Sequence, residues 1–374
     1  MASKTCVQFQ TYPGETVRLV NESMMSWVKL IDPPLEDPFP TKRKIGRTWM
    51  DPGLQQAWVN MGIAGARLYF NFFRSVYESR RYIHAWECVN EPGVKTPEQR
   101  AALVVFTVEW SRLMHSIGCK VVVGNFSTGT PHPPEIHELA PIFEGAEYWS
   151  VREYSAPSMR FDVTWYNLRY RRLVAALREA GVEPPPLFIG ESGVDGGMRD
   201  DHQPDWKGKG YLWFEQERLL SRSEHIADRI WYDEEAQKDS YVVAIFGFLV
   251  GGNVDWLSFE MLPILPALIV YVNSIAGQPT TPPPLPPPPV TPPPTAFPAY
   301  DEVIAAACAQ MGVPYTPGFA LWKTAVAQKL GVIPLKGECL TMPGFVFQIW
   351  PNGIVIAKIG QWDKVLVVRN GQGA

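Results

Sequence analysis

The chain has 374 residues, of which 46% are hydrophobic, and its formal net charge is −4. This length suffices for two or three domains, or for one large barrel with a smaller domain attached. No basic stripe and no block of like charges occurs, which argues against nucleic acid as a partner. No apolar run is long and unbroken enough to indicate a membrane span, so we expect no membrane partner. We also expect the protein to be a monomer.

Cysteine usage argues against a disulfide framework and against a zinc site. The cysteines are scattered, odd in number and without a CxxC pair. Only Cys308 and Cys339 could pair with each other, and nothing in the sequence requires it. We therefore expect neither a metal nor a cofactor.

Strand-like runs alternate with helix-like stretches up to residue 277. The runs span residues 6–11, 26–31, 44–50, 82–90, 120–127, 146–155, 186–192 and 243–251. This alternation indicates a parallel sheet, and eight repeats in about 270 residues match a closed (β/α)8 TIM barrel. The alternative, an open doubly wound sheet, would need a glycine-rich phosphate loop after the first strand. "CVQFQTYPGETV" contains no such loop, so we predict the barrel.

The clearest helix signals follow the third and fourth runs. Residues 51–80 begin with Asp51 as N-cap and a proline at the first helical position, and have apolar residues at helical spacing. Residues 96–118 begin with Thr-Pro, with a glutamine three residues after the threonine, and end in glycine. This pattern predicts a capping box and a glycine stop. Further helices are expected over 165–181 and, as the eighth of the barrel, over 258–277.

A proline-rich segment divides the chain. "GQPTTPPPLPPPPVTPPPT" cannot join a helix or a sheet, and we expect an extended polyproline II spacer of ~3.1 Å per residue rather than an SH3 ligand. The predicted organisation is therefore a catalytic barrel over 1–277, a Pro-rich linker over 278–295 and a small α+β accessory domain over 296–374.

The accessory domain is expected to begin with helices and end with strands. "WPNGI" contains the Asn-Gly pair of a tight hairpin turn. We interpret the domain as an attachment module for a polysaccharide, a cell wall or another protein, because tethering raises the local concentration of an insoluble substrate. The expected helices cover 299–312 and 318–331, and the expected strands cover 345–350, 353–360 and 364–370.

Two glutamates end strand-like runs of the barrel. Glu91 follows the fourth run in "AWECVNEP", and Glu191 ends the seventh run in "LFIGESG". Barrel enzymes place their chemistry at the carboxyl ends of strands. A single glutamate there is often only a loop carboxylate or a helix cap. Two of them on strands that face each other across the ring are expected to converge over the barrel mouth.

These motifs resemble those of the clan A glycoside hydrolases, the barrel enzymes that include cellulases, mannanases and β-xylosidases. The resemblance covers residues 1–277 in architecture and is specific only around "WECVNEP" and "FIGESG". It implies a retaining β-glycosidase in which Glu91 is the general acid/base and Glu191 the nucleophile. The two carboxyl groups would lie about 5–5.5 Å apart. Asn90 would bind the 2-hydroxyl of the sugar.

Other strand ends provide candidates for the substrate site. Tyr154 lies where the clan places a tyrosine that hydrogen-bonds the nucleophile. Arg47 is expected near the nucleophile, which it would keep ionised, with an external salt bridge as the alternative. Trp49 is expected at the site, with core packing as the alternative. Asn125 ends the fifth run, and Trp256, just past the eighth, is a candidate sugar platform.

The sequence departs from the clan pattern because His84 lies too early in its strand to join the site. Glu87 is expected deeper in the barrel, where a buried carboxylate needs a partner. The insertion 192–219 is expected to form a wall of the site, with Trp206 and Trp213 as stacking candidates. Its neighbouring acidic and histidine residues at 200–202 are interpreted as solvent-facing, because they lack metal-ligand spacing.

Three functions are compatible with these residues. The first is hydrolysis of a polysaccharide, and a variant of it is a peptidoglycan lysin of phage or bacterial origin that uses the same carboxylate pair. The third is a carbohydrate-binding barrel without catalysis. We expect action outside the cell or on the cell wall, although "MASKTCVQFQ" shows no signal peptide.

Overall fold

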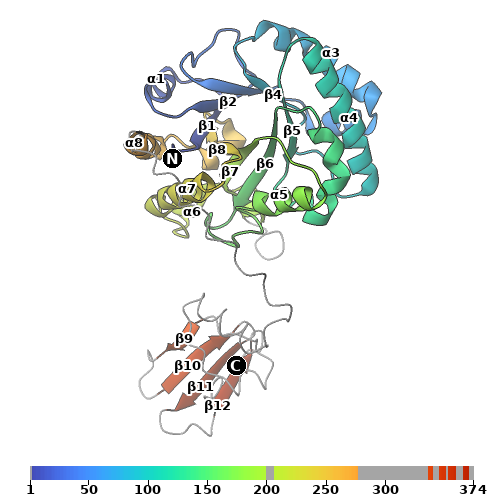
Figure 1. Cartoon of the computed structure of the whole chain (residues 1–374). Coiled ribbons are helices and arrows are strands. Elements are labelled where there is room, and N and C mark those ends of the chain that lie inside the picture. The colour runs from blue at the N-terminus through green and yellow to red at the C-terminus, as the bar shows by residue number, and fades with distance from the viewer. Residues whose placement is uncertain are drawn as a thin grey trace, which may run out of the picture. The chain divides into compact units, whose positions relative to one another are not determined.

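The computed structural model describes residues 2–198 and 206–276, and four strands in the C-terminal part of the chain. The chain divides into two compact units, Met1–Pro282 and Pro283–Ala374. The first unit contains the parallel barrel, and the second contains an antiparallel sheet (Figure 1). None of the helices in the described ranges is both long and apolar enough to cross a lipid bilayer.

The first unit is a closed barrel of eight parallel strands in chain order, which confirms the predicted (β/α)8 fold. Strand β1 closes the ring by pairing with both β2 and β8, for example through Val7 opposite Val28 and Cys6 opposite Phe246. The strands are β1 (Thr5–Phe9), β2 (Trp27–Ile31), β3 (Arg43–Arg47), β4 (Ala85–Glu87), β5 (Val121–Phe126), β6 (Tyr148–Ser155), β7 (Leu187–Val194) and β8 (Val242–Val250).

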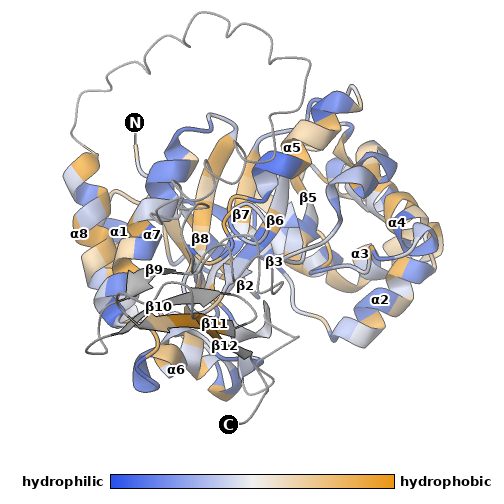
Figure 2. Cartoon of the chain, turned by 90° about the horizontal axis from the view of Figure 1, so that it is seen from below, coloured by the Kyte–Doolittle hydropathy of each residue, from blue (hydrophilic) through white to orange (hydrophobic). Residues whose placement is uncertain are grey.

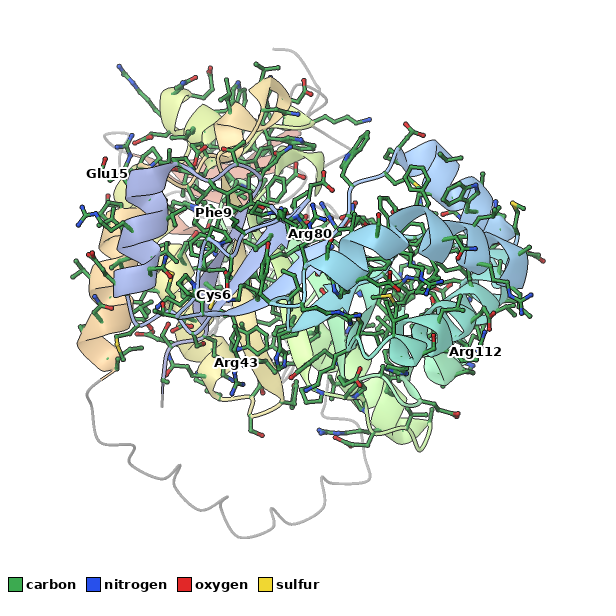
Figure 3. The ribbon with its side chains drawn as sticks, turned by 90° about the horizontal axis from the view of Figure 1, so that it is seen from above. Cys6, Phe9, Glu15, Arg43, Arg80 and Arg112 are labelled. Carbon is green, nitrogen blue, oxygen red and sulfur yellow. The ribbon has the colours of Figure 1, made fainter. Side chains whose placement is uncertain are left out.

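Helices surround the strands, as expected where parallel strands are buried on both faces. Figure 2 shows the hydrophobic strands at the centre and hydrophilic residues on the outer helices. Figure 3 shows the same arrangement from above: Cys6 and Phe9 are buried, whereas Glu15 and Arg112 lie at the outside. The helices are α1 (Gly14–Glu22), α2 (Pro52–Asn60), α3 (Ile63–Ser79), α4 (Pro97–Ser116), α5 (Tyr170–Glu179), α6 (Tyr211–Gln216), α7 (Arg222–Gln237) and α8 (Leu265–Ile275).

Three short 3-10 segments lie in the described connections that follow β5, β7 and β8. Between β5 and β6 a 3-10 segment takes the place of an α-helix. The segments are η1 (Pro133–Phe143), η2 (Gly196–Met198) and η4 (Val254–Phe259).

The interior of the barrel is layered because alternate residues of each strand point inward. Its lower layer is aromatic, with the Trp27 ring centroid 5.0 Å from that of Phe188 and the Tyr148 centroid 4.9 Å from that of Phe188. Two residues further along β2 and four further along β6, the inward positions are Lys29 and Arg152, both fully buried in charged contacts. A charged layer therefore lies between the aromatic layer and the barrel mouth.

The predicted helix over 51–80 is two helices, and this corrects the sequence interpretation. The chain turns at Gly62, whose φ is +57°, and α3 then approaches α2 closely at Gly65. A Cβ built on Gly65 would lie 1.7 Å from the carbonyl oxygen of Trp58. Leu68 and Phe72, part of the expected apolar stripe, are exposed, because α3 buries the face that contains Tyr69 and Phe73 instead.

The predicted caps are present where their side chains can reach the backbone. Asp51 accepts a hydrogen bond from the N–H of Leu54 at 2.9 Å, and α4 has the expected capping box between Thr96 and Gln99. The helix expected over 165–181 begins only at Tyr170. Its first turn is held by a carboxylate from the barrel wall rather than by a local cap.

The second unit contains a four-stranded antiparallel sheet in the order β12-β11-β10-β9. Strands β10 and β11 pair so that Trp350 lies opposite Gly353, as in a tight hairpin. The linker and the two expected helices of this unit lie outside the described residues. The strands are β9 (Lys336–Cys339), β10 (Phe345–Trp350), β11 (Gly353–Lys358) and β12 (Val365–Arg369).

Candidate active site

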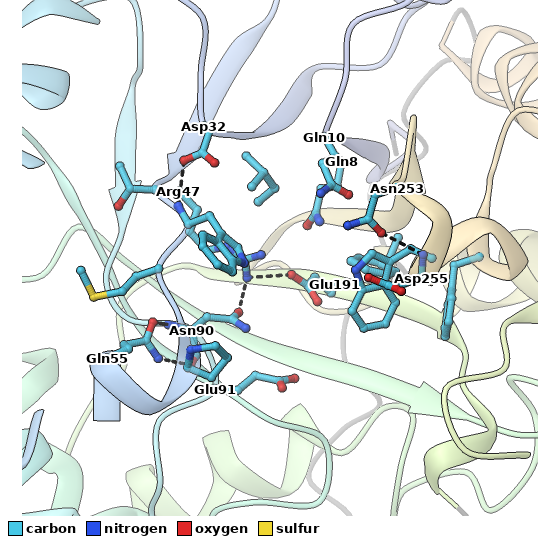
Figure 4. A pocket seen from close by; sticks show the side chains of 18 of the residues that line it. Gln8, Gln10, Asp32, Arg47, Gln55, Asn90, Glu91, Glu191, Asn253 and Asp255 are labelled. Atoms are coloured by element: carbon cyan, nitrogen blue, oxygen red, sulfur yellow. Dashed lines mark hydrogen bonds and ion pairs between the residues drawn. The ribbon is translucent and has the colours of Figure 1, made fainter. Parts of the chain in front are cut away.

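Glu91 and Glu191 line one cavity of about 750 Å³ at the mouth of the barrel, which we call the main cavity. Figure 4 shows their side chains extending into it from different elements. Glu191 lies within β7, which continues to Val194 rather than ending at the glutamate. Glu91 lies four residues beyond the last residue of β4, Glu87, so the loop and not the strand holds it.

The backbone at Glu91 has an unusual conformation that neighbouring groups hold in place. Its φ is +45°, a left-handed value that a non-glycine residue adopts only where its surroundings impose it. The Glu91 N–H donates to the carbonyl oxygen of Asn125 at 3.1 Å. The carboxamide of Gln55, from α2, accepts from the N–H of Asn90 at 2.9 Å and donates to its carbonyl at 2.7 Å. Helix α2 and strand β5 therefore fix the direction of the Glu91 side chain.

Glu191 is buried among cations. Its Oε1 lies 3.0 Å from Arg47 Nη1, 3.2 Å from Lys29 Nζ and 3.4 Å from Arg152 Nε. Its Oε2 accepts a hydrogen bond from the hydroxyl of Tyr154 at 3.1 Å. Burial alone would raise the pKa of Glu191, but the charges of Arg152, Lys29 and Arg47 outweigh it and hold the pKa far below its ordinary value. These cations therefore favour the ionised form of Glu191.

A second buried carboxylate balances these cations. Glu87 lies 2.9 Å from Lys29 Nζ and 3.3 Å from Arg152 Nη2, and all three side chains are fully buried. Burial opposes its ionisation, but Lys29, Arg152 and Arg47 lower the pKa of Glu87. Burial and the charge of Arg152 lower the pKa of Lys29 to about 8. The charged layer of the barrel is thus a single network that includes Glu191.

The pKa of Glu91 is shifted in the opposite direction to that of Glu191. Glu91 is exposed to the cavity, but the surrounding protein atoms still desolvate its carboxyl group. This desolvation, together with the charge of Glu191, raises the pKa of Glu91. The cavity therefore favours a protonated carboxyl at Glu91 and an ionised one at Glu191. Environments that separate the pKa values of two carboxyl groups in this way suit one to acid catalysis and the other to nucleophilic attack.

The same charged network binds the side-chain oxygen of Asn90. Its Oδ1 accepts hydrogen bonds from Arg47 Nη1 and, at 2.8 Å, from Arg152 Nη2. With the oxygen held by two guanidinium groups, the amide N–H donors of Asn90 are oriented away from them. These donors can serve a hydroxyl group in the main cavity, which Asn90 also lines.

Aromatic side chains form part of the cavity wall. Trp49 is 59% exposed and lines the main cavity, so it is not a core residue. Trp256 also lines it and makes edge contacts with Phe248 and Phe259, at centroid distances of 5.4 and 5.5 Å. The Phe248 ring in turn contacts Tyr154 at 6.1 Å. These rings give the polar cavity apolar surfaces against which a sugar ring can stack.

Several expected residues lie elsewhere. Asn125 is fully buried behind the Glu91 corner, donates to the carbonyl of Val89 at 3.1 Å and lines neither described cavity. Trp206 and Trp213 pack on Phe214 and also line neither cavity. The segment 200–202 lies outside the described residues. Within the described ranges, no cluster of three His, Cys, Asp or Glu side chains could hold a metal ion.

A second cavity of about 480 Å³ adjoins Glu91 on its other side. Hydroxyl, amide and ammonium groups line it: Gln56, Lys95, Gln99, Ser127, Thr128 and Thr130. Glu91 and Gln56 belong to the linings of both cavities. A ligand chain could therefore extend past Glu91 in both directions.

Sequence reasoning missed residues that the structure places close to the carboxylates. Lys29, Arg152 and Gln55 were not identified, and neither was Phe248. The sequence did contain a signal for Lys29 and Arg152. Each is a charged residue within an apolar strand, and the alternation of side chains along a strand places it on the same face as an inward-pointing residue. No local signal marks Gln55, because its role depends on where α2 packs.

Comparisons with known proteins give distant likenesses. No protein-family model and no curated protein matches the chain. Similar solved structures include an endo-β-1,3-glucanase of family GH128 from Pseudomonas viridiflava, at 12% identity and TM-score 0.40, covering 71% of this chain and 96% of that chain. An endo-1,4-β-D-mannanase from Thermotoga petrophila has 11% identity and TM-score 0.41, with coverages of 68% and 90%. A GH1 β-glucosidase from Exiguobacterium antarcticum has 10% identity and TM-score 0.37, with coverages of 63% and 76%. Likenesses this distant do not bear on the activity or the substrate of this chain.

Proposed function

We propose that this chain is a retaining glycoside hydrolase that cleaves β-glycosidic bonds of a polysaccharide or cell-wall glycan. Glu91 is the general acid/base and Glu191 is the nucleophile. The supporting observation is one cavity that holds two carboxyl groups whose pKa values are moved in opposite directions. Double displacement at an anomeric carbon requires one protonated and one ionised carboxyl group at the same bond.

In the first step a Glu191 oxygen forms a bond to the anomeric carbon as the bond to the leaving oxygen breaks. Glu91 transfers its proton to that oxygen, which keeps the electron pair of the broken bond. Glu191 Oε1 is engaged by three cations, whereas Oε2 receives the Tyr154 hydroxyl. Oε2 is therefore the attacking atom, and Tyr154 positions it.

In the second step water attacks the anomeric carbon of the glycosyl ester. The Glu91 carboxylate takes the proton of this water, and Glu191 departs as a carboxylate with the electron pair of the ester bond. The cations around Glu191 stabilise the departing charge, which favours this step. Asn90 donates to the 2-hydroxyl of the sugar, a bond that strengthens in the transition state.

The test is release of reducing sugar from β-glucan, mannan, xylan, chitin and purified peptidoglycan. We expect activity on one polymer, its loss in Glu191→Gln, and a decrease of about 10²–10⁴-fold in Glu91→Gln. Glu91→Gln should be impaired far less on aryl glycosides with acidic leaving groups, because their departure needs no proton. Glu179→Gln, on the exposed end of α5, is the matched control and should keep full activity.

Two results would contradict the proposal. Full activity in Glu191→Gln, with a circular dichroism spectrum like that of the wild type, would exclude Glu191 as nucleophile. Absence of release from every polymer, with polymer pull-down intact, would favour a carbohydrate-binding barrel without catalysis. Release from peptidoglycan alone would identify the lysin variant of the same chemistry.

A further inference from the structure

Two consecutive residues of strand β7, Gly190 and Glu191, face the interior of the barrel. Glu191 contacts the inward-facing Lys29 and Arg152. A Cβ built on Gly190 would point into the same interior, 2.2 Å from Oγ of Ser150 and 2.4 Å from Nη1 of Arg152. The side chains of a regular strand alternate between its two faces. The alternation is therefore interrupted between Gly190 and Glu191.

The cause is a β-bulge, which is visible in the pairing of β7 with both neighbouring strands. Against β6, one residue step corresponds to two steps of β7, from Ile189 to Glu191. Against β8, two steps correspond to three steps of β7, from Ile189 to Ser192. Strand β7 thus contains one extra residue at this point, and a shift by one residue moves the following side chains to the other face. Without the bulge, Glu191 would face the outer helices instead of the main cavity.

The charged layer of the barrel holds the bulge from the inside. Lys29 Nζ donates a hydrogen bond to the carbonyl oxygen of Gly190 at 2.9 Å. A side chain at position 190 would displace this layer, because its Cβ would also lie 2.9 Å from Oε1 of Glu87. Glycine at this position therefore lets the bulge and the buried charges occupy the same part of the interior.

Arg229 holds the bulge from the outside. It belongs to α7, which lies outside the ring of strands (Figure 1), and it is only 3% exposed. Its Nη1 donates to the carbonyl oxygen of Ser192 at 2.8 Å and to Ser192 Oγ at 3.0 Å. Ser192 Oγ in turn donates to the carbonyl oxygen of Phe246, in β8, at 3.1 Å. A Cβ on Gly247 would lie 2.6 Å from Arg229 Nη2, so the missing side chain there leaves room for the guanidinium group.

We propose that Arg229 is a positioning residue for the nucleophile. By binding Ser192 on the outer face, it keeps the bulge in place and the carboxylate of Glu191 directed into the main cavity. This inference rests on the proposed glycosidase function and adds to it a residue that acts through Glu191. Hydrogen bonds from a charged donor are strong and directional, which suits a group that fixes a backbone at an irregular point. Bulges next to active sites commonly redirect a side chain in this way.

The first test is Arg229→Met, which removes both hydrogen bonds and keeps a long side chain. The substrate is a dinitrophenyl glycoside of an oligosaccharide from the polymer that the wild type cleaves. Dinitrophenolate departs without a proton, so kcat/KM on this substrate reports the attack by Glu191 and not acid catalysis. We expect kcat/KM to fall about tenfold to 10²-fold, because a small displacement of a reacting group has an effect of this size.

Two further variants accompany it. Arg229→Lys keeps a charged donor but not the geometry of the guanidinium group, so kcat/KM should fall to a value between those of the wild type and Arg229→Met. Arg160→Met is the matched control and should keep full activity. It removes another arginine that binds α7, through Asp228 at 2.8 Å, without a contact to the bulge.

A second test separates positioning from a general loss of structure. In Glu191→Gly the nucleophile is absent, and azide can attack the anomeric carbon of the same substrate. A glycosyl azide forms as dinitrophenolate departs with the electron pair of the broken bond. Adding Arg229→Met should change this azide rate by no more than about twofold, because no carboxylate remains to be positioned.

The outcomes separate this inference from the proposed function. Unchanged kcat/KM in Arg229→Met, or an azide rate that falls as much as kcat/KM does, would overturn the role of Arg229 while the glycosidase assignment stands. If near-UV circular dichroism shows that Arg229→Met does not fold, Arg229→Lys decides, and kcat/KM equal to that of the wild type would overturn the role. A Glu191→Gln variant as active as the wild type would overturn the function itself, and this inference with it.

Discussion

Lys29 is one of three buried cations that surround the proposed nucleophile Glu191. It is fully buried, with its ammonium 2.9 Å from Glu87 and 3.2 Å from Glu191, and its Nζ also donates to the carbonyl of Gly190 at 2.9 Å. A buried lysine is tolerated only with such compensation. It therefore links the stability of the barrel interior to the position of Glu191.

Replacing Lys29 by methionine should affect both properties. The change leaves Glu87 short of a partner, and breaking a buried pair typically costs about 3–5 kcal/mol. We expect a loss of this size in urea unfolding and a lower kcat. Adding Glu87→Gln should restore part of the stability, because the buried carboxylate that lost its ammonium partner is then replaced by a neutral amide. A double variant that is no more stable than Lys29→Met would show that the pair is not coupled.

The pH dependence of kcat/KM should follow the two opposite pKa shifts. Glu191 must be ionised, and its lowered pKa places the acidic limb well below the ordinary value for glutamate. Glu91 must be protonated, and its raised pKa places the basic limb above that ordinary value. Glu91→Gln should abolish the basic limb on aryl glycosides. A basic limb that persists in this variant would assign it to another group, such as Lys29.

At the scale of elements, the close contact between α2 and α3 depends on a residue without a side chain. A Cβ on Gly65 would lie 1.7 Å from the Trp58 carbonyl oxygen, a distance that requires backbone movement. Because α2 also supplies Gln55, which holds Asn90, movement of this helix would reach the proposed acid/base.

Gly65→Ala should therefore lower the melting temperature by several degrees and reduce activity as well. Gly14→Ala is the matched control, since a Cβ there meets no atom within 4 Å. That change should be neutral or stabilise by about 0.4–1 kcal/mol. Thermal unfolding of the two variants side by side provides the measurement, and equal melting temperatures would contradict the close contact.

Glu153 connects strand β6 to helix α5. Its carboxyl oxygens accept the N–H groups of Leu168 and Tyr170, at 2.6 and 2.7 Å, and the hydroxyl of Tyr232. Burial raises the pKa of Glu153 to about 7. The folded state therefore retains a proton that the unfolded chain releases near pH 4.3, and the associated stability is present below that pH and lost as the pH rises toward 7.

Glu153→Gln should remove this titration. The variant is expected to be less stable than the wild type, because its amide N–H₂ replaces an oxygen that accepts from the backbone N–H of Leu168 or Tyr170, and these N–H groups can only donate. The difference in unfolding free energy between the wild type and the variant should decrease by on the order of 3 kcal/mol from pH 4.5 to pH 7.5, because only the wild type loses stability as Glu153 ionises. Urea unfolding at several pH values measures it. A difference that stays constant with pH would show that Glu153 does not titrate in this range.

At the scale of the whole molecule, the barrel has a core of its own. The described core residues that pack together run from Cys6 to Val272, all within the first unit. We expect a chain shortened to residues 1–282 to unfold at the same temperature as the barrel of the full chain, and to keep its activity on a soluble polymer. Differential scanning calorimetry of both chains measures this. A lower melting temperature after truncation would show that the second unit stabilises the barrel.

The sequence by itself determined the strand count and the barrel, and it identified both glutamates as candidates for the site. Strand periodicity, caps and a rigid Asn-Glu-Pro corner are local patterns, so they can be recognised without knowing what packs against them. Local pattern also predicted α4 with its capping box. The roles of Glu91 and Glu191 remain predictions, for which the opposite pKa shifts add physical support.

Only the tertiary structure decided which side chains surround those glutamates. Lys29 and Glu191 are 162 residues apart, and Gln55 and Asn90 are 35 apart, so no local period could indicate their contacts. Asn125 was expected at the substrate, but it is fully buried and its carbonyl accepts the N–H of Glu91. Closure of the barrel is the reason: it brings distant strands to one interior, where burial and charge, rather than sequence order, set the chemistry of each group.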